Sequence, residues 1–303
     1  MGNAIEARGL TKDYGGGRGI IGLDLRVPEG VVFGFLGPNG AGKTTTLRLL
    51  MGFLKADRGE ARVLGSPLDA DRRELHRHIG YVPGELALPS GERVKAYLDR
   101  CALLQGVDDL AQQRALLQEL AVPAHLRIRE LSKGNRQKVA LVQALQHSPR
   151  LLILDEPTDG LDPILRRRIG DLLRDHAAAG GTVFLSSHVS REIENVCDDV
   201  AIVVGGKLRS QAAVADLLRG IPLRINLAVP AAARARAQAI LQRRGARLLQ
   251  DADGRLRIQA KGDPLPLLAD LAAVGAHDAS FEDKDLEEIL LGLYADQPTE
   301  GGA

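Results

Sequence analysis

Short apolar runs alternate with helical stretches through roughly the first 210 residues of the chain. The runs are bounded by Gly, Pro or Asp and are apolar at most positions, which is typical of strands buried on both faces of a parallel sheet. We therefore predict a core of the α/β class. The predicted strands are Val31–Leu36, Glu60–Leu64, Ile79–Val82, Leu151–Leu154, Thr182–Ser186 and Val200–Val204.

A helical insert interrupts this alternation. No convincing strand lies between Gly91 and Gln146, where Leu and Ala recur at helical spacing, as at Leu116, Leu117 and Leu120. We expect a helical subdomain over about residues 84–147, set into a first domain that ends near residue 220.

A different pattern begins after about Gly220. It predicts the order β-α-β-β-α-β of the split βαβ motif, and hence a small α+β domain of ferredoxin-like type over residues 221–303. The segments are Arg224–Val229, Ala231–Arg244, Ala246–Gln250, Arg255–Ala260, Pro264–Ala273 and a short strand near Ala279–Phe281. Leu286, Ile289, Leu290 and Leu293 then have the spacing of an amphipathic closing helix.

The composition narrows the possible functions. The 303 residues carry 40 Lys and Arg against 39 Asp and Glu, a net charge of +1, with four Tyr, five Phe and no Trp. Because a near-neutral chain with few aromatic rings is poorly suited to polyanions, we expect no nucleic-acid partner. No apolar run approaches 18 residues and the N-terminus lacks a secretory pattern, so we expect a cytoplasmic chain that does not itself cross a membrane. Cys101 and Cys197 are expected to be reduced thiols.

A candidate phosphate loop follows the strand Val31–Leu36. Its sequence matches GxxxxGK[ST] at each fixed position and opens an apolar-periodic helix, which is the setting that the motif requires. Glycines let backbone N–H groups surround phosphate oxygens at a helix N-terminus. We expect Lys43 to neutralise the β/γ-phosphates and the Thr44 hydroxyl to bind Mg²⁺. The residues expected to bind the nucleotide are Gly37, Pro38, Asn39, Gly40, Ala41, Gly42, Lys43, Thr44 and Thr45.

The apolar strand Leu151–Leu154 ends in two carboxylates, Asp155 and Glu156. Beside a phosphate loop, a carboxylate at a strand end is placed to give Mg²⁺ its second protein contact, here through Asp155. Glu156, one residue further, points differently and is suited to polarise an attacking water.

Residues 131–137, Leu-Ser-Lys-Gly-Asn-Arg-Gln, form a further motif. Together with the phosphate loop and the carboxylate pair, they make the chain resemble the ATP-binding subunits of ABC transporters over about residues 5–220. The segment is similar to the family's signature, usually Leu-Ser-Gly-Gly-Gln, although it differs at its third and fifth positions. Ser132 fits an N-cap, and Gly134 allows an anion to approach a helix start. By resemblance, the ATP-contacting residues of the segment are Leu131, Ser132, Lys133, Gly134 and Asn135.

The resemblance assigns three more residues. Residues 158–162 resemble the D-loop, with Asp162 at the position of the family's aspartate. His188 closes a predicted strand and resembles the switch histidine that contacts the γ-phosphate. Tyr14 matches the aromatic residue that stacks on adenine.

Besides the signature segment, another position departs from the family pattern. Gly84 stands where the family normally has a glutamine that binds Mg²⁺ and couples to the membrane partner. Glycine has no side chain to ligate a metal, so either Glu85 reaches the site or water completes the shell of Mg²⁺. We hypothesise that Glu85 takes part.

The resemblance implies a mechanism with partners. A chain with one copy of each motif is expected to dimerise head to tail around two ATP-Mg²⁺, with hydrolysis by water oriented on Glu156 and charge stabilised by Lys43 and His188. A separate transmembrane permease would contact residues 84–105, which places the chain peripherally on the cytoplasmic face of a membrane. The signature variant and residues 286–290 look like those of drug and antibiotic-resistance exporters of ABC-2 type, with a drug, antibiotic or lipid-like cargo.

Two alternatives remain open at the level of sequence. A soluble ABC ATPase acting on ribosomes or DNA is disfavoured, because such relatives carry tandem ATPase domains or long coiled-coil inserts. A binding module that does not hydrolyse ATP is disfavoured because Asp155, Glu156 and His188 are all present.

Overall fold

The computed structural model describes residues 2–68, 73–282 and 285–295. It divides into two compact units, Met1–Val214 and Ala215–Ala303, which are described separately. The division lies six residues before the boundary expected at residue 220, at the start of helix α8 (Val214–Gly220). The expected boundary lies where the pattern of strands and helices changes along the sequence, after Gly220, which is the last residue of this helix.

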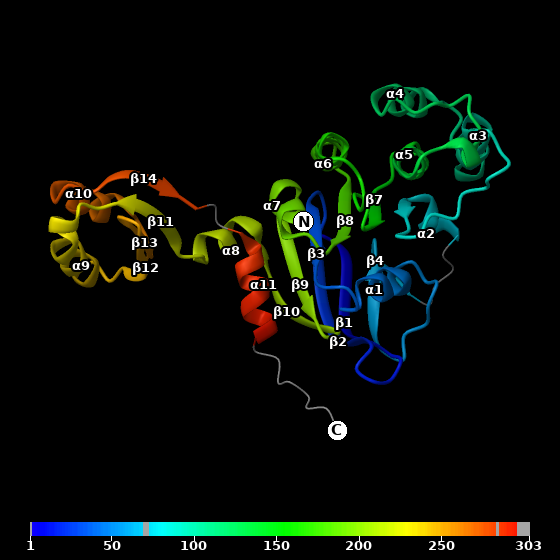
Figure 1. Cartoon of the computed structure of the whole chain (residues 1–303). Helices are drawn as coiled ribbons and strands as arrows, with labels where there is room; N and C mark the ends of the chain where they lie inside the picture. Colours follow the sequence, from blue (N-terminus) through cyan, green and yellow to red (C-terminus); the bar gives the residue numbers. More distant parts are fainter. Residues whose placement is uncertain (1, 69–72, 283–284, 296–303) are drawn as a thin grey trace. The chain divides into compact units, whose positions relative to one another are not determined.

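The centre of the first unit is a six-stranded sheet (Figure 1). The strand order is β10-β9-β3-β8-β7-β6, parallel except for the antiparallel edge strand β10. Every residue of β3, β7 and β8 is buried, as the continuous apolar runs predict. The bounds are β3 Val32–Leu36, β6 Ile79–Val82, β7 Leu151–Asp155, β8 Thr182–Ser187, β9 Asp199–Val204 and β10 Lys207–Ala213.

A second, antiparallel sheet in this unit was not expected. Its strands are β1 (Asn3–Asp13), β2 (Gly19–Pro28), β4 (Arg58–Val63) and β5 (Ser66–Pro67), in the order β2-β1-β4-β5. The prediction that Glu60–Leu64 belongs to the parallel sheet is therefore wrong. β4 pairs antiparallel with β1, and its Arg and Glu side chains are exposed, so only alternate positions contribute to the core.

Helix α1 (Lys43–Leu50) contributes to a core cluster shared by the antiparallel sheet and one face of the six-stranded sheet. Within that cluster the Phe184 ring lies 5.9 Å from the ring of Phe33 and 5.4 Å from that of Phe35. Helices α6 (Pro163–Ala178) and α7 (Ser190–Val196) pack on strands β3 and β8, and the short α2 (Arg73–Arg77) packs on β6. The layers hold the ends of β3, β7 and β8 together.

The helical insert is confirmed. It contains α3 (Val94–Gln105), α4 (Ala111–Glu119), a single 3₁₀ turn (Ile128–Glu130) and α5 (Lys133–Leu145). The buried Gln146 amide links them, because it donates to the Leu98 carbonyl at 3.3 Å and accepts from Gln113 at 3.1 Å.

The second unit has the predicted split βαβ arrangement. Its sheet is antiparallel throughout, in the order β12-β13-β11-β14, and Ile225, Leu227, Leu256 and Ile258 are buried in one cluster with residues of α9 and α10. The predicted closing helix is present as α11, with Leu286 and Leu290 buried. The bounds are β11 Leu223–Ala228, a 3₁₀ turn Ala231–Ala233, α9 Arg234–Arg243, β12 Arg247–Ala252, β13 Arg255–Ala260, α10 Leu265–Ala273, β14 His277–Phe281 and α11 Leu286–Ala295.

Candidate nucleotide site

The candidate phosphate loop connects β3 to α1, and its shape depends on glycine. Gly42 precedes the helix with φ +97°, and a Cβ there would lie 2.5 Å from the Gly19 carbonyl oxygen. A Cβ on Gly37 would lie 2.3 Å from the carbonyl oxygen of Val203. Gly40 also has a left-handed φ, +82°, but faces open space. The loop therefore lies directly against β2 and β9, and its N–H groups meet the start of an eight-residue helix.

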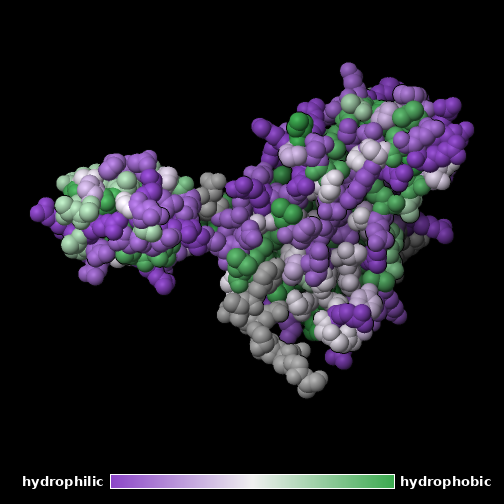
Figure 2. All heavy atoms as spheres, viewed as in Figure 1, coloured by the Kyte–Doolittle hydropathy of each residue, from purple (hydrophilic) through white to green (hydrophobic). Residues whose placement is uncertain are grey.

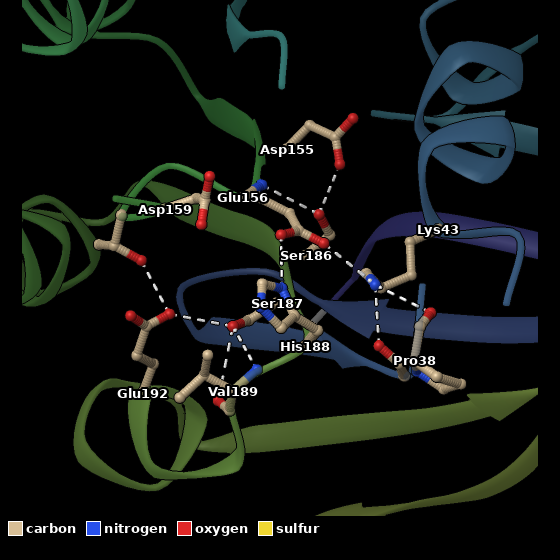
Figure 3. A network of polar contacts seen from close by, with 12 residues as sticks. Pro38, Lys43, Asp155, Glu156, Asp159, Ser186, Ser187, His188, Val189 and Glu192 are labelled. Carbon is tan, nitrogen blue, oxygen red and sulfur yellow. Dashed lines mark hydrogen bonds and ion pairs between the residues drawn. The ribbon is translucent and has the colours of Figure 1, made fainter. Parts of the chain in front are cut away.

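Lys43 is buried at the mouth of this loop, with 5% of its surface exposed. Its ammonium donates to the carbonyl of Gly37 at 2.8 Å and to that of Pro38 at 3.1 Å, and it lies 3.1 Å from Glu156 Oε1 (Figure 3). A bound phosphate can replace these carbonyl oxygens as the hydrogen-bond acceptor of the ammonium, and the charge-assisted hydrogen bonds to phosphate are stronger.

Asp155 and Thr44 form a pair of oxygen ligands suited to Mg²⁺. The Thr44 hydroxyl donates to Asp155 Oδ2 at 2.8 Å, and the Ser186 hydroxyl donates to Asp155 Oδ1 at 2.6 Å. Asp155 is 2% exposed. Burial raises the pKa of the neighbouring Tyr81 hydroxyl, and the negative charge of Asp155 raises that pKa further. Ser186 was not predicted as a site residue, since nothing distinguishes a serine at a strand end until its partner is known.

Glu156 points away from this pair and toward a histidine. Its backbone is left-handed, with φ +49°, and its N–H donates to the Ser186 hydroxyl at 3.1 Å. Glu156 Oε2 lies 2.6 Å from His188 Nδ1, while Oε1 faces Lys43. A non-glycine residue in this conformation costs about 1–3 kcal/mol, so the surrounding contacts must hold it. The structure thus brings Lys43, Glu156 and His188 together, as Figure 3 shows.

The glycine at the expected glutamine position lies beside the metal-ligand pair. A Cβ on Gly84 would lie 3.2 Å from Asp155 Oδ2, whereas Glu85 is exposed. The hard oxygen donors of Thr44 and Asp155 suit Mg²⁺, which usually keeps several waters beside one or two protein ligands. The residues present therefore fit an ATP-bound Mg²⁺.

The signature-like segment lies at the start of α5. Ser132 is its N-cap, with the hydroxyl accepting from the Asn135 N–H at 3.3 Å, and Leu131 is buried. The Lys133 ammonium lies 3.1 Å from Asp159, and Asp162 caps α6 by accepting from the Leu165 N–H at 2.9 Å. In the part of the chain that the structure describes, the side-chain hydrogen bonds and ion pairs found for the segment join it to its own helix and to residues 158–162. None of them reaches the phosphate loop.

Tyr14 lies in a glycine-rich turn between β1 and β2. Its side chain is 48% exposed, and the Lys12 ammonium lies 5.9 Å from the ring centroid. Gly15, Gly16 and Gly17 all have left-handed φ angles, so the turn presents the ring at the surface. An exposed ring of this kind is available for stacking.

Sequence comparison assigns the chain to a known family. Residues 20–159 match the family model described as ABC transporter. The daunorubicin/doxorubicin resistance ATP-binding protein of Streptomyces peucetius is 32% identical over 305 residues, covering 96% of this chain and 92% of the relative. The chain belongs to the ABC transporter ATP-binding proteins. This confirms the resemblance inferred from the motifs, and with it the assignment as an ATP-hydrolysing enzyme.

Other comparisons agree with this assignment. The bacitracin transport ATP-binding protein of Bacillus licheniformis is 37% identical to this ABC ATPase over 218 residues, covering 69% of each protein. A solved structure titled as the ATP-binding subunit of an ABC transporter superposes with a TM-score of 0.66 and 27% identity, covering 71% of this chain and 92% of that one. Within the described residues, no helix is both long and apolar enough to span a bilayer. On the face seen in Figure 2, hydrophilic residues dominate and hydrophobic ones form small separate patches.

Proposed function

We propose that this chain is the nucleotide-binding subunit of an ABC exporter, which hydrolyses ATP-Mg²⁺ as a head-to-tail dimer and drives a separate transmembrane permease. The observation that carries the proposal is the arrangement of Lys43, Glu156 and His188 at the mouth of the phosphate loop. A cation that neutralises phosphate charge, a carboxylate that acts on water and an imidazole that donates to a phosphate oxygen are together suited to phosphoryl transfer to water.

Each residue has a distinct task in this mechanism. The phosphate loop and Lys43 bind the β/γ-phosphates, which replace the carbonyl oxygens that the ammonium now contacts. Glu156 orients a water and accepts its proton as the water oxygen attacks the γ-phosphorus and the bond to the β-phosphate breaks, giving ADP and phosphate. His188 donates a hydrogen bond to a γ-phosphate oxygen. Mg²⁺, held by Thr44 and Asp155, supplies charge neutralisation when bound.

The position of the signature-like segment supports a dimer. The start of α5 is suited to bind an anion through Ser132 and the first N–H groups of the helix, but its observed contacts are with α5 and residues 158–162. A second copy of the chain would bring this segment to the γ-phosphate of the first copy's ATP. Two ATP molecules would then join two chains.

A cleft in the first unit is suited to receive the permease. It has a volume of about 570 Å³, and Phe53, Tyr81 and Leu104 are among the residues that line it. Phe53 is 55% exposed and Leu104 is 74% exposed, while the Phe53 ring meets Tyr81 edge-on at 5.5 Å. These exposed apolar side chains, at the border of the helical insert, are suited to pack against the apolar face of a short amphipathic helix of a membrane protein. Docking there would hold the chain peripherally at the cytoplasmic face of the membrane.

The cargo class is inferred from the relatives. Their names refer to daunorubicin/doxorubicin resistance, bacitracin transport and, for a protein of Paraburkholderia xenovorans that is 37% identical over 221 residues, Nod factor export. We propose export of an amphiphilic drug, antibiotic or lipid-like molecule. Affinity purification of the tagged chain from membranes tests this proposal: recovery of a multi-spanning membrane protein supports it, and recovery of ribosomes or DNA instead would overturn it.

Replacing Tyr14 tests adenine binding. We expect Tyr14→Ala to raise the KM for ATP by about 5- to 150-fold, since stacking of a base on an aromatic ring contributes about 1–3 kcal/mol. The kcat should change little, because the ring does not touch the reacting phosphate. Tyr14→Phe keeps the ring and should behave as the wild type. An unchanged KM in Tyr14→Ala would remove Tyr14 from the site.

Replacing Glu85 tests whether it compensates for Gly84. If the Glu85 carboxylate holds a water of the Mg²⁺ shell, Glu85→Ala should raise the Mg²⁺ concentration for half-maximal ATPase activity by about tenfold. Glu74→Ala, at an exposed site on α2, is a suitable control for loss of a surface carboxylate. An unchanged Mg²⁺ dependence would mean that water alone completes the shell.

A further inference from the structure

Glu192, on α7, contacts both segments that carry the hydrolytic residues. The Thr158 hydroxyl donates to Glu192 Oε2 at 2.8 Å. The Ser187 hydroxyl donates to the same oxygen at 3.0 Å, as Figure 3 shows. Thr158 follows Glu156 by two residues, and Ser187 immediately precedes His188. One carboxylate oxygen therefore joins the turn after β7 to the end of β8.

The other oxygen of Glu192 anchors the carboxylate to α6. Glu192 Oε1 lies 3.4 Å from an Arg166 guanidinium nitrogen, and Arg166 Nε donates to the Leu161 carbonyl at 2.8 Å. The Glu192 side chain is only 18% exposed, and Ser187 is 2% exposed. An ionised carboxylate only accepts hydrogen bonds, so it is well matched to two hydroxyl donors and a guanidinium. Low exposure makes these contacts stronger than those of a surface ion pair.

The Ser187 hydroxyl continues the connection to the residue after His188. Its oxygen accepts from the Val189 N–H at 3.0 Å while its proton goes to Glu192. The backbone is therefore fixed on both sides of His188. On the other segment, the Glu156 backbone is left-handed and requires external contacts to hold it, and the Thr158–Glu192 hydrogen bond is one of them.

We propose that Glu192 is a positioning residue for ATP hydrolysis, which sets the relative placement of Glu156 and His188 by joining the two segments that carry them. It does not touch the nucleotide and acts through Thr158 and Ser187. The proposal rests on the hydrolytic roles given above to Glu156 and His188. Because those two residues act together on the attacking water and the γ-phosphate, a shift of one segment relative to the other lowers the rate without removing a group that binds ATP.

The test compares Glu192→Ala with Glu192→Gln. We expect Glu192→Ala to lower kcat by roughly 10- to 100-fold, the size of effect that misplacement of a reacting group by about 1 Å produces, with the KM for ATP unchanged. Glu192→Gln should retain more activity than Glu192→Ala, because its amide oxygen still accepts from both hydroxyls, although its NH2 group then faces Arg166 and the ion pair is lost. Thr158→Val, which removes one donor at nearly constant volume, should give an intermediate kcat even if the alanine variant folds poorly.

A matched control lies in the same unit. Glu119 of α4 also pairs with an arginine of α6, Arg168, at 3.3 Å, and among the described residues no hydrogen bond or ion pair is found between Glu119 and the site. Glu119→Ala should retain the wild-type kcat. If Glu192→Ala and Thr158→Val also retain it, or if Glu192→Ala lowers kcat no more than Glu119→Ala does, the proposal is wrong.

A double variant separates positioning from general stability. In a His188→Ala background, Glu192→Ala should lower kcat much less than it does in the wild type, because the residue it places is absent. Equal fold-losses in the two backgrounds would overturn the inference. The roles of Glu156 and His188 are tested by their own single variants, so a failure there is distinguishable from a failure of Glu192.

Discussion

Glu156→Gln is expected to lower kcat for ATP hydrolysis by about 10²- to 10⁴-fold, the usual contribution of a general base. The amide has nearly the same volume, and its single oxygen can replace Glu156 Oε1, which lies 3.1 Å from the Lys43 ammonium. Its NH2 group then takes the place of Oε2, 2.6 Å from His188 Nδ1, and donates to the neutral imidazole. The amide cannot take a proton from water. Because the phosphate loop is unaltered, ATP affinity should stay close to that of the wild type. Steady-state hydrolysis measures the loss of kcat, and equilibrium binding measures the affinity.

The same variant should reveal the dimer. If ATP joins two chains and hydrolysis releases them, Glu156→Gln with ATP-Mg²⁺ should elute as a dimer on size-exclusion chromatography, and as a monomer without nucleotide. Adding Ser132→Ala should weaken that dimer, since Ser132 caps the helix proposed to face the partner's ATP. Glu119→Gln serves as the isosteric control at a distant ion pair. Wild-type hydrolysis in Glu156→Gln, or an ATP-bound monomer, would contradict the assignment.

The sequence predicts the parallel sheet well because its strands are buried on both faces. β3, β7 and β8 are buried throughout, and each contains a run of apolar residues that gives a strong signal without knowledge of its partners. The antiparallel sheet was missed because β1 is interrupted by irregularities in register, and its charged residues alternate with buried ones. In β2, apolar and other residues do alternate, with Leu23, Leu25 and Val27 buried. A search of the sequence for apolar residues at every second position would have found this strand.

Some residues of the nucleotide site can likewise be identified from the sequence, and others only from the fold. Lys43 is found from the sequence because the spacing of the glycines and the lysine in its motif is restrictive, and Asp155 is found because it ends an apolar strand in a chain that has such a loop. Ser186 and Glu192 have no such spacing, since their partners lie 31 and 34 residues away along the chain. Their importance comes from parallel strand ends that meet at one edge of the sheet, which only the fold reveals.

A substitution in the phosphate loop is expected to have the second large effect, on ATP affinity. Gly42→Ala is expected to lower ATP affinity by about 30- to 5,000-fold, because two costs act at one position. The left-handed φ of +97° disfavours any side chain by about 1–2 kcal/mol, and forcing a Cβ into contact adds about 1–3 kcal/mol. The obstacle is rigid: the Gly19 carbonyl oxygen and Ile20 Cγ2 each lie 2.5 Å from the new atom. Calorimetric titration with ATP, together with the thermal midpoint of unfolding, measures both consequences.

Gly40→Ala separates the two costs. Gly40 has a similar φ, +82°, but an added Cβ there meets no atom within 4 Å. Only the backbone cost of about 1–2 kcal/mol applies, so the loss of affinity should be about 5- to 30-fold. If the two variants lose equal affinity, the close approach of the loop to β2 is not what shapes it. If Gly42→Ala loses more and its thermal midpoint falls further, contact between the loop and the antiparallel sheet sets the nucleotide site, and that sheet is part of the site's architecture.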